Sequence, residues 1–325
     1  MSSLHIAVLS DIHYAGPREQ AVGDDYETRV IANPFLRFML RLYREHVWLR
    51  YPLHQNGQLD RFLATVPTVD YIVANGDYSC NTSAVGLSDD AAMESAQICI
   101  GKLRSQFGER LRLNFGDHEL GKLRLMGTRG GLRLKSWERA IAELGIQPFW
   151  RLDLGNYVLF NCVSTLLALP VFDHDILPDE RDRWLKLREQ HLAELRSAFD
   201  SLKPQQRLIF FCHDPTALPF LDRDEMIQPK LRQIERTIIG HLHSNLYLRL
   251  SKFLSGLPVI HFCGHSIRRM STAVNDAHHW KSFNVQLCPS LAGIQLLNDG
   301  GFLTIELDAK ANGSARLQFH RLPRK

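Results

Sequence analysis

The chain lacks the segments that would insert it into a membrane or direct it to secretion. No apolar run approaches the ~20 residues that a membrane-spanning helix needs. The start, MSSLHIAVLS, lacks the basic segment, apolar core and small-residue cleavage site of a signal peptide. We therefore expect a cytoplasmic protein, and peripheral contact with the inner face of a membrane stays open as an addition.

Cysteine is scarce and has no recognisable spacing. The six cysteines, at positions 80, 99, 162, 212, 263 and 288, fit neither a metal-binding nor a disulfide pattern. This excludes a disulfide-rich secreted domain and predicts reduced, mostly buried thiols. Internal repeats and nucleic-acid-binding motifs are also lacking, and a net charge of +4 over 325 residues does not demand a nucleic-acid partner.

The composition instead fits one large folded unit. With 45% hydrophobic and 23% charged residues, the chain can bury a sizeable core. We expect a single domain over residues 1–325 with inserts at about 14–68 and 120–150. The first insert is expected because Asp11 and Asp77 are separated by more than twice the ~30 residues of a strand–helix crossover.

Five polar clusters follow apolar runs in order along the chain. They are SDIH at 10–13, NGDYSCN at 75–81, NFGDHELG at 114–121, FCHDP at 211–215 and IIGHLHSN at 238–245. Each comes after β-branched or aromatic residues, so each is expected where a buried strand ends and a loop begins. Sites in open α/β sheets form at such strand ends.

The clusters bring together imidazoles and carboxylates without a thiolate. Such a mixture suits two divalent metal ions, with Mn, Fe and Zn all acceptable. On extended backbone, the Asp-x-His and His-x-His spacings would point both side chains to one side. Any one histidine is more often a core residue, but five clusters in order favour a metal site. The candidate ligands are Asp11, His13, Asp77, Asp117, His213, His241 and His243.

The ordered clusters resemble the motifs D-x-H, GD, GNH-D/E, a lone His and G-H-x-H of the calcineurin-like metallophosphoesterases. The match covers residues 4 to about 245. The resemblance implies an α/β (α+β) fold in which two stacked mixed β-sheets are flanked by helices in a four-layer sandwich. It also implies that Asp77 bridges two metal ions. The first ion would be held by Asp11, His13, Asp77 and His243, and the second by Asp77, Asp117, His213 and His241.

The resemblance further implies a hydrolase acting on phosphoester or pyrophosphate bonds, in which a hydroxide shared by the metals attacks phosphorus. His118 would contact the phosphoryl or leaving oxygen, and Glu119 would orient its ring. Asp117 stands where the family usually has asparagine. Its carboxylate adds negative charge and should weaken the pull of the second ion on bound water. We still expect Asp117 to be a ligand, because carboxylate oxygen binds these metals well.

Two added segments bear on the substrate. The basic stretch 121–135 contains Arg124, Arg129 and Arg133, which we expect to bind substrate phosphates; a solvated loop is an equal alternative. Segment 34–50 has an apolar face edged with arginines, as a membrane-surface helix does. A helix that packs on the core has the same pattern, and we favour that interpretation.

The 30–60 region also resembles, more weakly, the branch related to the chlamydial UDP-2,3-diacylglucosamine pyrophosphatase. It implies a phosphorylated small-molecule substrate that is lipid-linked, with peripheral membrane contact through 34–50. Two alternatives stay open, namely a phosphodiesterase on nucleotides or nucleic acid and a catalytically weak binding scaffold. The expected strands lie near 4–10, 70–76, 111–115, 150–154, 157–163, 207–213, 236–241, 257–263, 301–307 and 316–322. The expected helices lie near 34–50, 90–107, 135–144 and 182–201.

Overall fold

Two five-stranded β-sheets form the centre of the computed structural model, which describes residues 3–122, 130–262, 265–308 and 314–322. One sheet has the order β10-β9-β1-β2-β3 and the other β4-β5-β6-β7-β8. The strands are β1 (Leu4–Leu9), β2 (Tyr71–Ala74), β3 (Leu111–Leu113), β4 (Arg151–Leu154), β5 (Tyr157–Cys162), β6 (Arg207–Cys212), β7 (Ile234–Ile239), β8 (Val285–Leu287), β9 (Gly301–Leu307) and β10 (Arg316–Arg321).

Both sheets are mixed. In the first, β1, β2 and β3 are parallel, while β9 and β10 are added in antiparallel pairs. In the second, β5 to β8 are parallel and β4 forms an antiparallel hairpin with β5. The carboxyl ends of the parallel strands therefore carry the loops in which sites of α/β proteins form.

The sheets stack face to face, and alternate side chains of each strand point to opposite sides. Ile6 and Val8 of β1 share one apolar core with Ile209 and Phe211 of β6. Leu9 points the other way, into a larger core that includes residues of the helices. This is the two-residue period of a strand buried on both faces.

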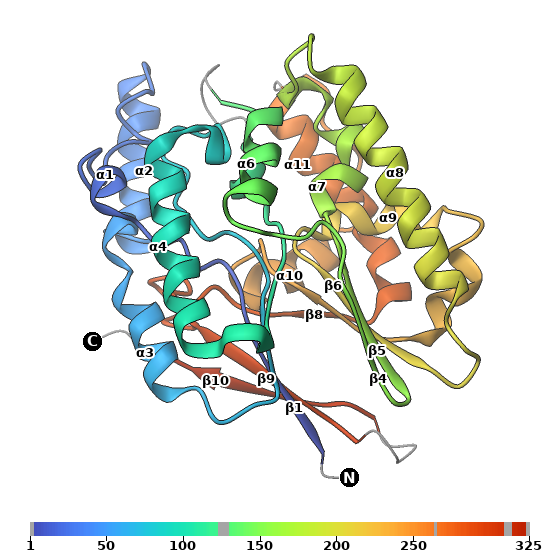
Figure 1. Cartoon of the computed structure of the whole chain (residues 1–325). Helices are drawn as coiled ribbons and strands as arrows, with labels where there is room; N and C mark the ends of the chain where they lie inside the picture. The colour runs from blue at the N-terminus through green and yellow to red at the C-terminus, as the bar shows by residue number, and fades with distance from the viewer. Residues whose placement is uncertain (1–2, 123–129, 263–264, 309–313, 323–325) are drawn as a thin grey trace.

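Helices cover the outer faces of the stacked sheets. Figure 1 shows α3 and α4 beside the sheet that contains β1, and α8 and α9 beside the sheet that contains β6. The expected architecture of two mixed sheets flanked by helices is confirmed. The α-helices are α1 (Pro17–Gln20), α2 (Pro34–His46), α3 (Gly57–Thr65), α4 (Asp90–Phe107), α5 (Asp117–Leu120), α6 (Leu134–Ala142), α7 (Ser164–Leu167), α8 (Arg181–Asp200), α9 (Leu218–Asp222), α10 (Asn245–Phe253) and α11 (His265–Asn275).

The structure differs from the expected segments at three places. The strand expected at 257–263 is irregular over residues 257–262, where Pro258 supplies no backbone N–H for a ladder. Strand β8 is instead the edge strand beside β7. With three residues, it is too short for an alternation of apolar and polar residues to be recognised in the sequence. Helix α2 buries none of its residues, so within segment 34–50 the favoured core-facing interpretation holds only for Leu49, which follows the helix and is buried.

Two further findings concern the cysteines and the possibility of a membrane-spanning helix. Five of the cysteines lie in the described part of the chain, and all five are buried and free. Among the described helices, none combines the length and apolar character needed to cross a bilayer.

The carboxyl ends of β1 and β7 approach each other so closely that a side chain at Gly240 has no room. A Cβ built on Gly240 would lie 2.0 Å from Ser10 Oγ and 2.5 Å from Asp11 Oδ2. Gly101, in the middle of α4, is the opposite case, since a Cβ there would meet nothing within 4 Å.

We expect Gly240→Ala to lower the free energy of unfolding by roughly 1–3 kcal/mol, the usual penalty for overpacking. Gly101→Ala is the matched control and should raise stability by about 0.5–1 kcal/mol, because alanine is the better helix former. Urea unfolding of both variants measures the difference. Equal, small effects would show that the contact between the strand ends is loose.

Candidate metal centre

The backbone itself turns the candidate ligands toward one point. Asp11, His13, Asp77, His241 and His243 all have positive φ, between 48° and 60°. This left-handed conformation is uncommon outside glycine and costs about 1–3 kcal/mol per residue when surroundings enforce it. The side chains therefore leave from turns beyond the strands. The expectation that the Asp-x-His and His-x-His pairs lie on extended backbone is wrong.

Backbone hydrogen bonds hold these turns. Asp11 N donates to Gly76 O at 3.2 Å, and His13 N donates to Asp77 O at 3.0 Å. Together they continue the pairing of β1 with β2 past the ends of both strands. Gly240 N donates to His213 O at 2.9 Å and joins the loops after β6 and β7 in the same way.

All seven candidate ligands and His118 converge in space. They form four groups of three, and the potential ligand atoms of each group lie within 4.8 Å of one another. Asp77 belongs to two groups: its Oδ2 lies 3.2 Å from His213 Nε2 and 3.9 Å from His13 Nε2. The groups are Asp11/His13/His243, His13/Asp77/His118, Asp117/His213/His241 and Asp11/Asp77/His213.

His213 is oriented as a metal ligand should be. Its Nδ1 lies 2.5 Å from the carbonyl of Asn75, and since a carbonyl can only accept, Nδ1 carries the proton. Nε2 then faces Asp77 Oδ2 at 3.2 Å and Asp117 Oδ1 at 3.3 Å. Burial lowers the pKa of His213, but Asp77 and Asp11 outweigh it and raise the pKa well above its usual value. The carboxylates thus favour positive charge at this point.

His13 and His243 lie next to each other beside Asp11. Their Nε2 atoms are 3.4 Å apart and their rings are stacked, with centroids 5.0 Å apart. Burial and the neighbouring His118 imidazole lower the pKa of His13 to about 3, and burial with His13 holds the pKa of His243 well below normal. Two neutral imidazoles with Asp11 Oδ1 at 3.3 Å from His243 Nε2 fit a shared divalent cation.

The expected support of His118 by Glu119 is wrong. His118 Nδ1 instead lies 3.2 Å from the carbonyl of Ser79, which fixes the ring. Glu119 braces the backbone, because its carboxylate accepts three main-chain N–H groups at 2.7–2.9 Å. Burial and Asp77 raise the pKa of Glu119 to about 8, which those three donors oppose. The donors are the N–H groups of Asp77, Tyr78 and Gly116.

Asp117, the residue that departs from the family pattern, is shared between two kinds of partner. Its Oδ1 lies 2.9 Å from His241 Nδ1 and faces His213, whereas its Oδ2 is paired with the ammonium of Lys122. Burial raises the pKa of Asp117, but Lys122 and His241 outweigh it and hold the pKa well below normal. Lys122 therefore compensates the negative charge that an asparagine would not carry.

Sequence reasoning missed this role of Lys122 and placed it among the basic residues of the 121–135 loop. The detectable signal was an acid at a normally neutral ligand position with a lysine five residues further on. Of the expected substrate residues, Arg124 and Arg129 lie outside the described part of the chain. Arg133 donates to the carbonyls of Leu132 and Gly130, in its own loop.

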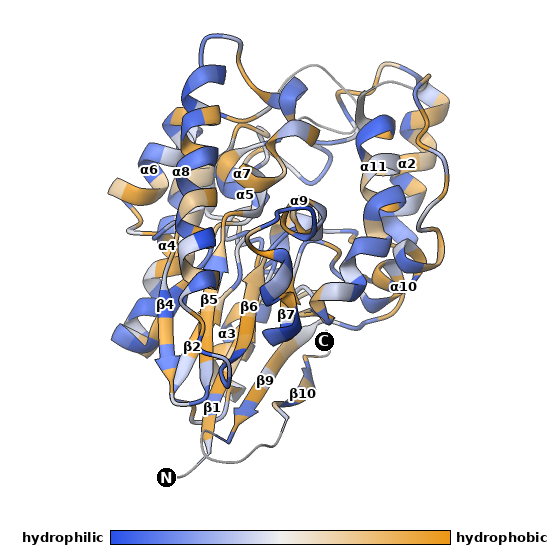
Figure 2. Ribbon diagram, turned by 90° about the vertical axis from the view of Figure 1, so that its right-hand side faces the viewer, coloured by the Kyte–Doolittle hydropathy of each residue, from blue (hydrophilic) through white to orange (hydrophobic). Residues whose placement is uncertain are grey.

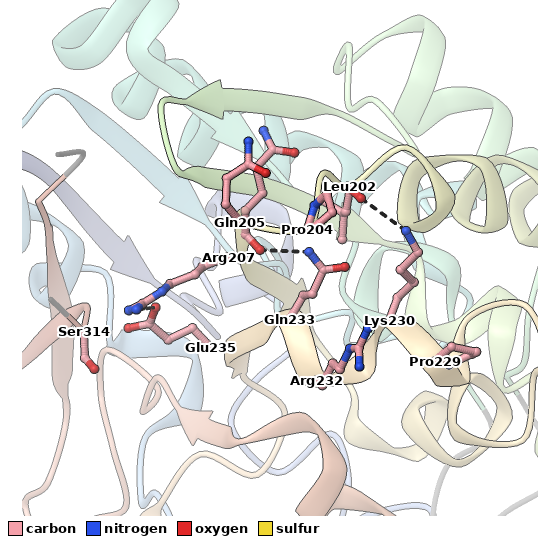
Figure 3. Close-up of a pocket in the computed structure, with 11 residues that line it drawn as sticks. Leu202, Pro204, Gln205, Arg207, Pro229, Lys230, Arg232, Gln233, Glu235 and Ser314 are labelled. Atoms are coloured by element: carbon pink, nitrogen blue, oxygen red, sulfur yellow. Dashed lines mark hydrogen bonds and ion pairs between the residues drawn. The ribbon is translucent and has the colours of Figure 1, made fainter. Parts of the chain in front are cut away.

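A pocket elsewhere does not belong to the metal centre. The hollow of about 690 Å³ in Figure 3 lies at the amino ends of β6 and β7, where Arg207 pairs with Glu235 at 3.3 Å. Lys230 in its wall donates to the carbonyls of Asp200 and Leu202. Its polar groups are largely bound to the protein itself, and the metal residues lie at the opposite ends of these strands.

Comparison with known proteins agrees with the geometry. The family model described as calcineurin-like phosphoesterase matches residues 4–268. The chain belongs to the calcineurin-like phosphoesterase family. It is therefore a metal-dependent hydrolase of phosphoesters, and its cofactor is a pair of divalent metal ions. No curated protein matches the sequence.

Similar solved structures are distant. Purple acid phosphatase PPD1 from yellow lupin is 10% identical with a TM-score of 0.37; the match covers 74% of this chain and 38% of the lupin chain. Phosphopantetheinyl hydrolase from Mycobacterium tuberculosis is 14% identical, with coverages of 74% and 84% and a TM-score of 0.37. GAP50, the anchor in the inner membrane complex of Plasmodium, is 12% identical, with coverages of 100% and 90% and a TM-score of 0.38. At these scores the likenesses add nothing to the family assignment.

We expect Lys122→Met to lower the free energy of unfolding by roughly 1.5–3 kcal/mol in chelator, because Asp117 loses a charged hydrogen-bond partner in a buried place. The double variant Asp117→Asn/Lys122→Met should lose less than Lys122→Met alone, since an amide needs no counter-charge. Urea unfolding of the two single variants and the double variant gives the coupling. Strictly additive effects would contradict the compensation.

Proposed function

We propose that this phosphohydrolase cleaves the pyrophosphate bond of a lipid-linked nucleotide sugar. Family membership supports hydrolysis at phosphorus with two divalent ions. What the proposal adds is the substrate, and it depends on the side chains that adjoin the metal centre.

The seven candidate ligands divide naturally between two ions. Asp11, His13 and His243 would hold the first, Asp117, His213 and His241 the second, and Asp77 would contact both. When bound, such a pair of ions supplies Lewis acidity toward the phosphoryl oxygens and lowers the pKa of water. The charges of three carboxylates and the added charge of Lys122 set how strongly the ions act.

His118 is placed to serve the departing oxygen. Its Nδ1 faces Ser79 O, which turns Nε2 toward the cluster, 4.0 Å from Asp77 Oδ2. Burial lowers the pKa of His118 in spite of Asp77, and the ring takes up a second proton more readily once negative charge arrives nearby. A phosphorylated substrate brings that charge, so Nε2 would take up a proton from solvent and pass it to the leaving oxygen, while Nδ1 keeps its own proton toward Ser79 O.

A lipid-linked substrate is proposed because a wall of aromatic side chains adjoins the residues that would hold the first ion. The ring of Trp48 lies 4.8 Å from that of His243, 5.8 Å from that of Tyr247 and 6.2 Å from that of Tyr43. The Tyr43 and Tyr247 hydroxyls are hydrogen-bonded at 2.8 Å. Apolar surface thus begins at the metal centre itself, and it offers acyl chains a place beside the phosphates.

The other hypotheses fit these observations less well. A phosphodiesterase on nucleotides would use the aromatic wall to stack a base, but it has no use for the exposed apolar helices that adjoin the wall. A degenerate binding scaffold has no need of seven competent donors, five of them held in strained turns.

The deciding assay uses chelator-stripped protein with Mn²⁺ added back, on an acylated UDP-sugar and on bis(p-nitrophenyl) phosphate. We expect UMP release from the acylated UDP-sugar, and His118→Ala should slow it by about 10²–10⁴-fold. Trp48→Ala should raise KM for that substrate about tenfold and leave the small diester unaffected.

Tyr51→Ala is the matched control, since Tyr51 is an exposed neighbour outside the wall, and it should change neither KM. Turnover of the diester alone would retain the enzyme class and contradict the lipid-linked substrate. Metal binding without turnover of either compound would favour the scaffold.

A further inference from the structure

Helix α2 presents its apolar side chains to solvent. Phe35, Phe38 and Met39 are 70%, 56% and 46% exposed, and no residue of the helix is buried. Its beginning is nevertheless well formed, because the Asn33 side chain accepts from Phe35 N and Leu36 N. A capped, amphipathic helix whose apolar side faces solvent indicates an interaction surface.

A second apolar stretch follows the last metal motif. Leu246, Leu250 and Phe253 form one stripe of α10, and Phe253 is 84% exposed. Phe262 in the following segment is 88% exposed and Met270 of α11 is 55% exposed. Most of the exposed large apolar side chains in the described part of the chain lie in α2 or between residues 246 and 270.

These segments form one surface, here called the apolar face: α2, α10, residues 254–262 and α11. Figure 2 shows the three helices along the same side of the molecule. The hydrogen bond between Tyr43 and Tyr247 joins α2 to α10. Gly256 N donates to Asn275 O, which joins the end of α10 to the end of α11.

The positive charge of the apolar face indicates which kind of partner it can bind. Arg41, Arg249 and Arg268 are exposed on it. Among its described residues, Glu45 at the end of α2 is the one acid. A second copy of the chain would place like charges against each other in a symmetric pair. A surface of anionic lipid headgroups complements both the arginines and the phenylalanines between them.

We propose that the apolar face docks on an anionic lipid bilayer, with Phe35, Phe253 and Phe262 inserted among the acyl chains. Trp48 and Tyr247 connect this face to His243 of the metal centre. Docking therefore places the hydrolytic site at the level of the headgroups. The inference depends on the surface alone and holds whatever phosphorylated compound is the substrate.

The test is co-sedimentation of the full chain with vesicles of phosphatidylcholine, with and without phosphatidylglycerol. We expect binding to the vesicles that contain phosphatidylglycerol. Phe253→Ser and Phe262→Ser should each weaken that binding about tenfold or more, which corresponds to losing one buried phenylalanine. Arg249→Gln should weaken it about fivefold, and the effect should disappear at high salt.

Phe319→Ser is the matched control, because Phe319 is 44% exposed on β10, outside the segments of the apolar face, and it should bind as the unchanged protein does. Since the replaced side chains are exposed, the variants should keep the melting temperature and should turn over detergent-dispersed substrate normally. Normal turnover with lost vesicle binding supports docking separately from the substrate proposal.

Two results would overturn docking. One is vesicle binding that Phe253→Ser and Phe262→Ser leave unchanged. The other is a stable dimer that both variants dissociate while the unchanged protein ignores vesicles, because the face would then be a protein interface.

Discussion

The structure depends on the attraction between carboxylates delivered by one sheet and imidazoles delivered by the other. Asp11, Asp77 and Asp117 follow β1, β2 and β3, while the three histidines of the opposite side follow β6 and β7. Asp77 is held from several directions: its N–H donates to Glu119, its Oδ1 accepts from His118 N, and its carbonyl accepts from His13 N. Burial raises the pKa of Asp77, but His118 and His213 outweigh it and keep the pKa below normal. The fixed position of the Asp77 carboxylate therefore holds the two sheets together at the carboxyl ends of their parallel strands.

Much of this was predictable from the sequence because strand ends and ligand chemistry leave local signals. The five clusters and α4 follow from apolar runs, motif order and helical spacing, whereas the two mixed sheets were implied by the resemblance to the calcineurin-like family. The left-handed backbone at His241 was not predictable, since it results from contacts between distant loops. The bracing of Asp77 and Tyr78 by Glu119 was missed for the same reason, whereas the pairing of Asp117 with Lys122 had a local signal that was overlooked. Segment 34–50 shows the limit of periodicity, because an amphipathic pattern identifies an apolar face but not what covers it.

The metal centre and the apolar face are parts of one surface. Trp48 touches His243 through ring contact and borders the aromatic pair that joins α2 to α10. Two segments therefore add to the same side of the family fold: the segment between β1 and β2, which contains α2, and the segment after β7, which contains α10 and α11. In this family fold the chemistry is set by the strand ends, and the choice of substrate is left to segments that lie on them.

The central claim is that Asp77 joins two ions held by residues from both sheets. A crystal structure of the Mn²⁺-loaded protein, with anomalous difference maps at the manganese edge, tests it most directly. Two peaks roughly 3.5–4 Å apart are expected, one beside Asp11, His13 and His243 and the other beside Asp117, His213 and His241, with the Asp77 carboxylate between them. A single peak, or a second ion without Asp117 among its ligands, would contradict the account.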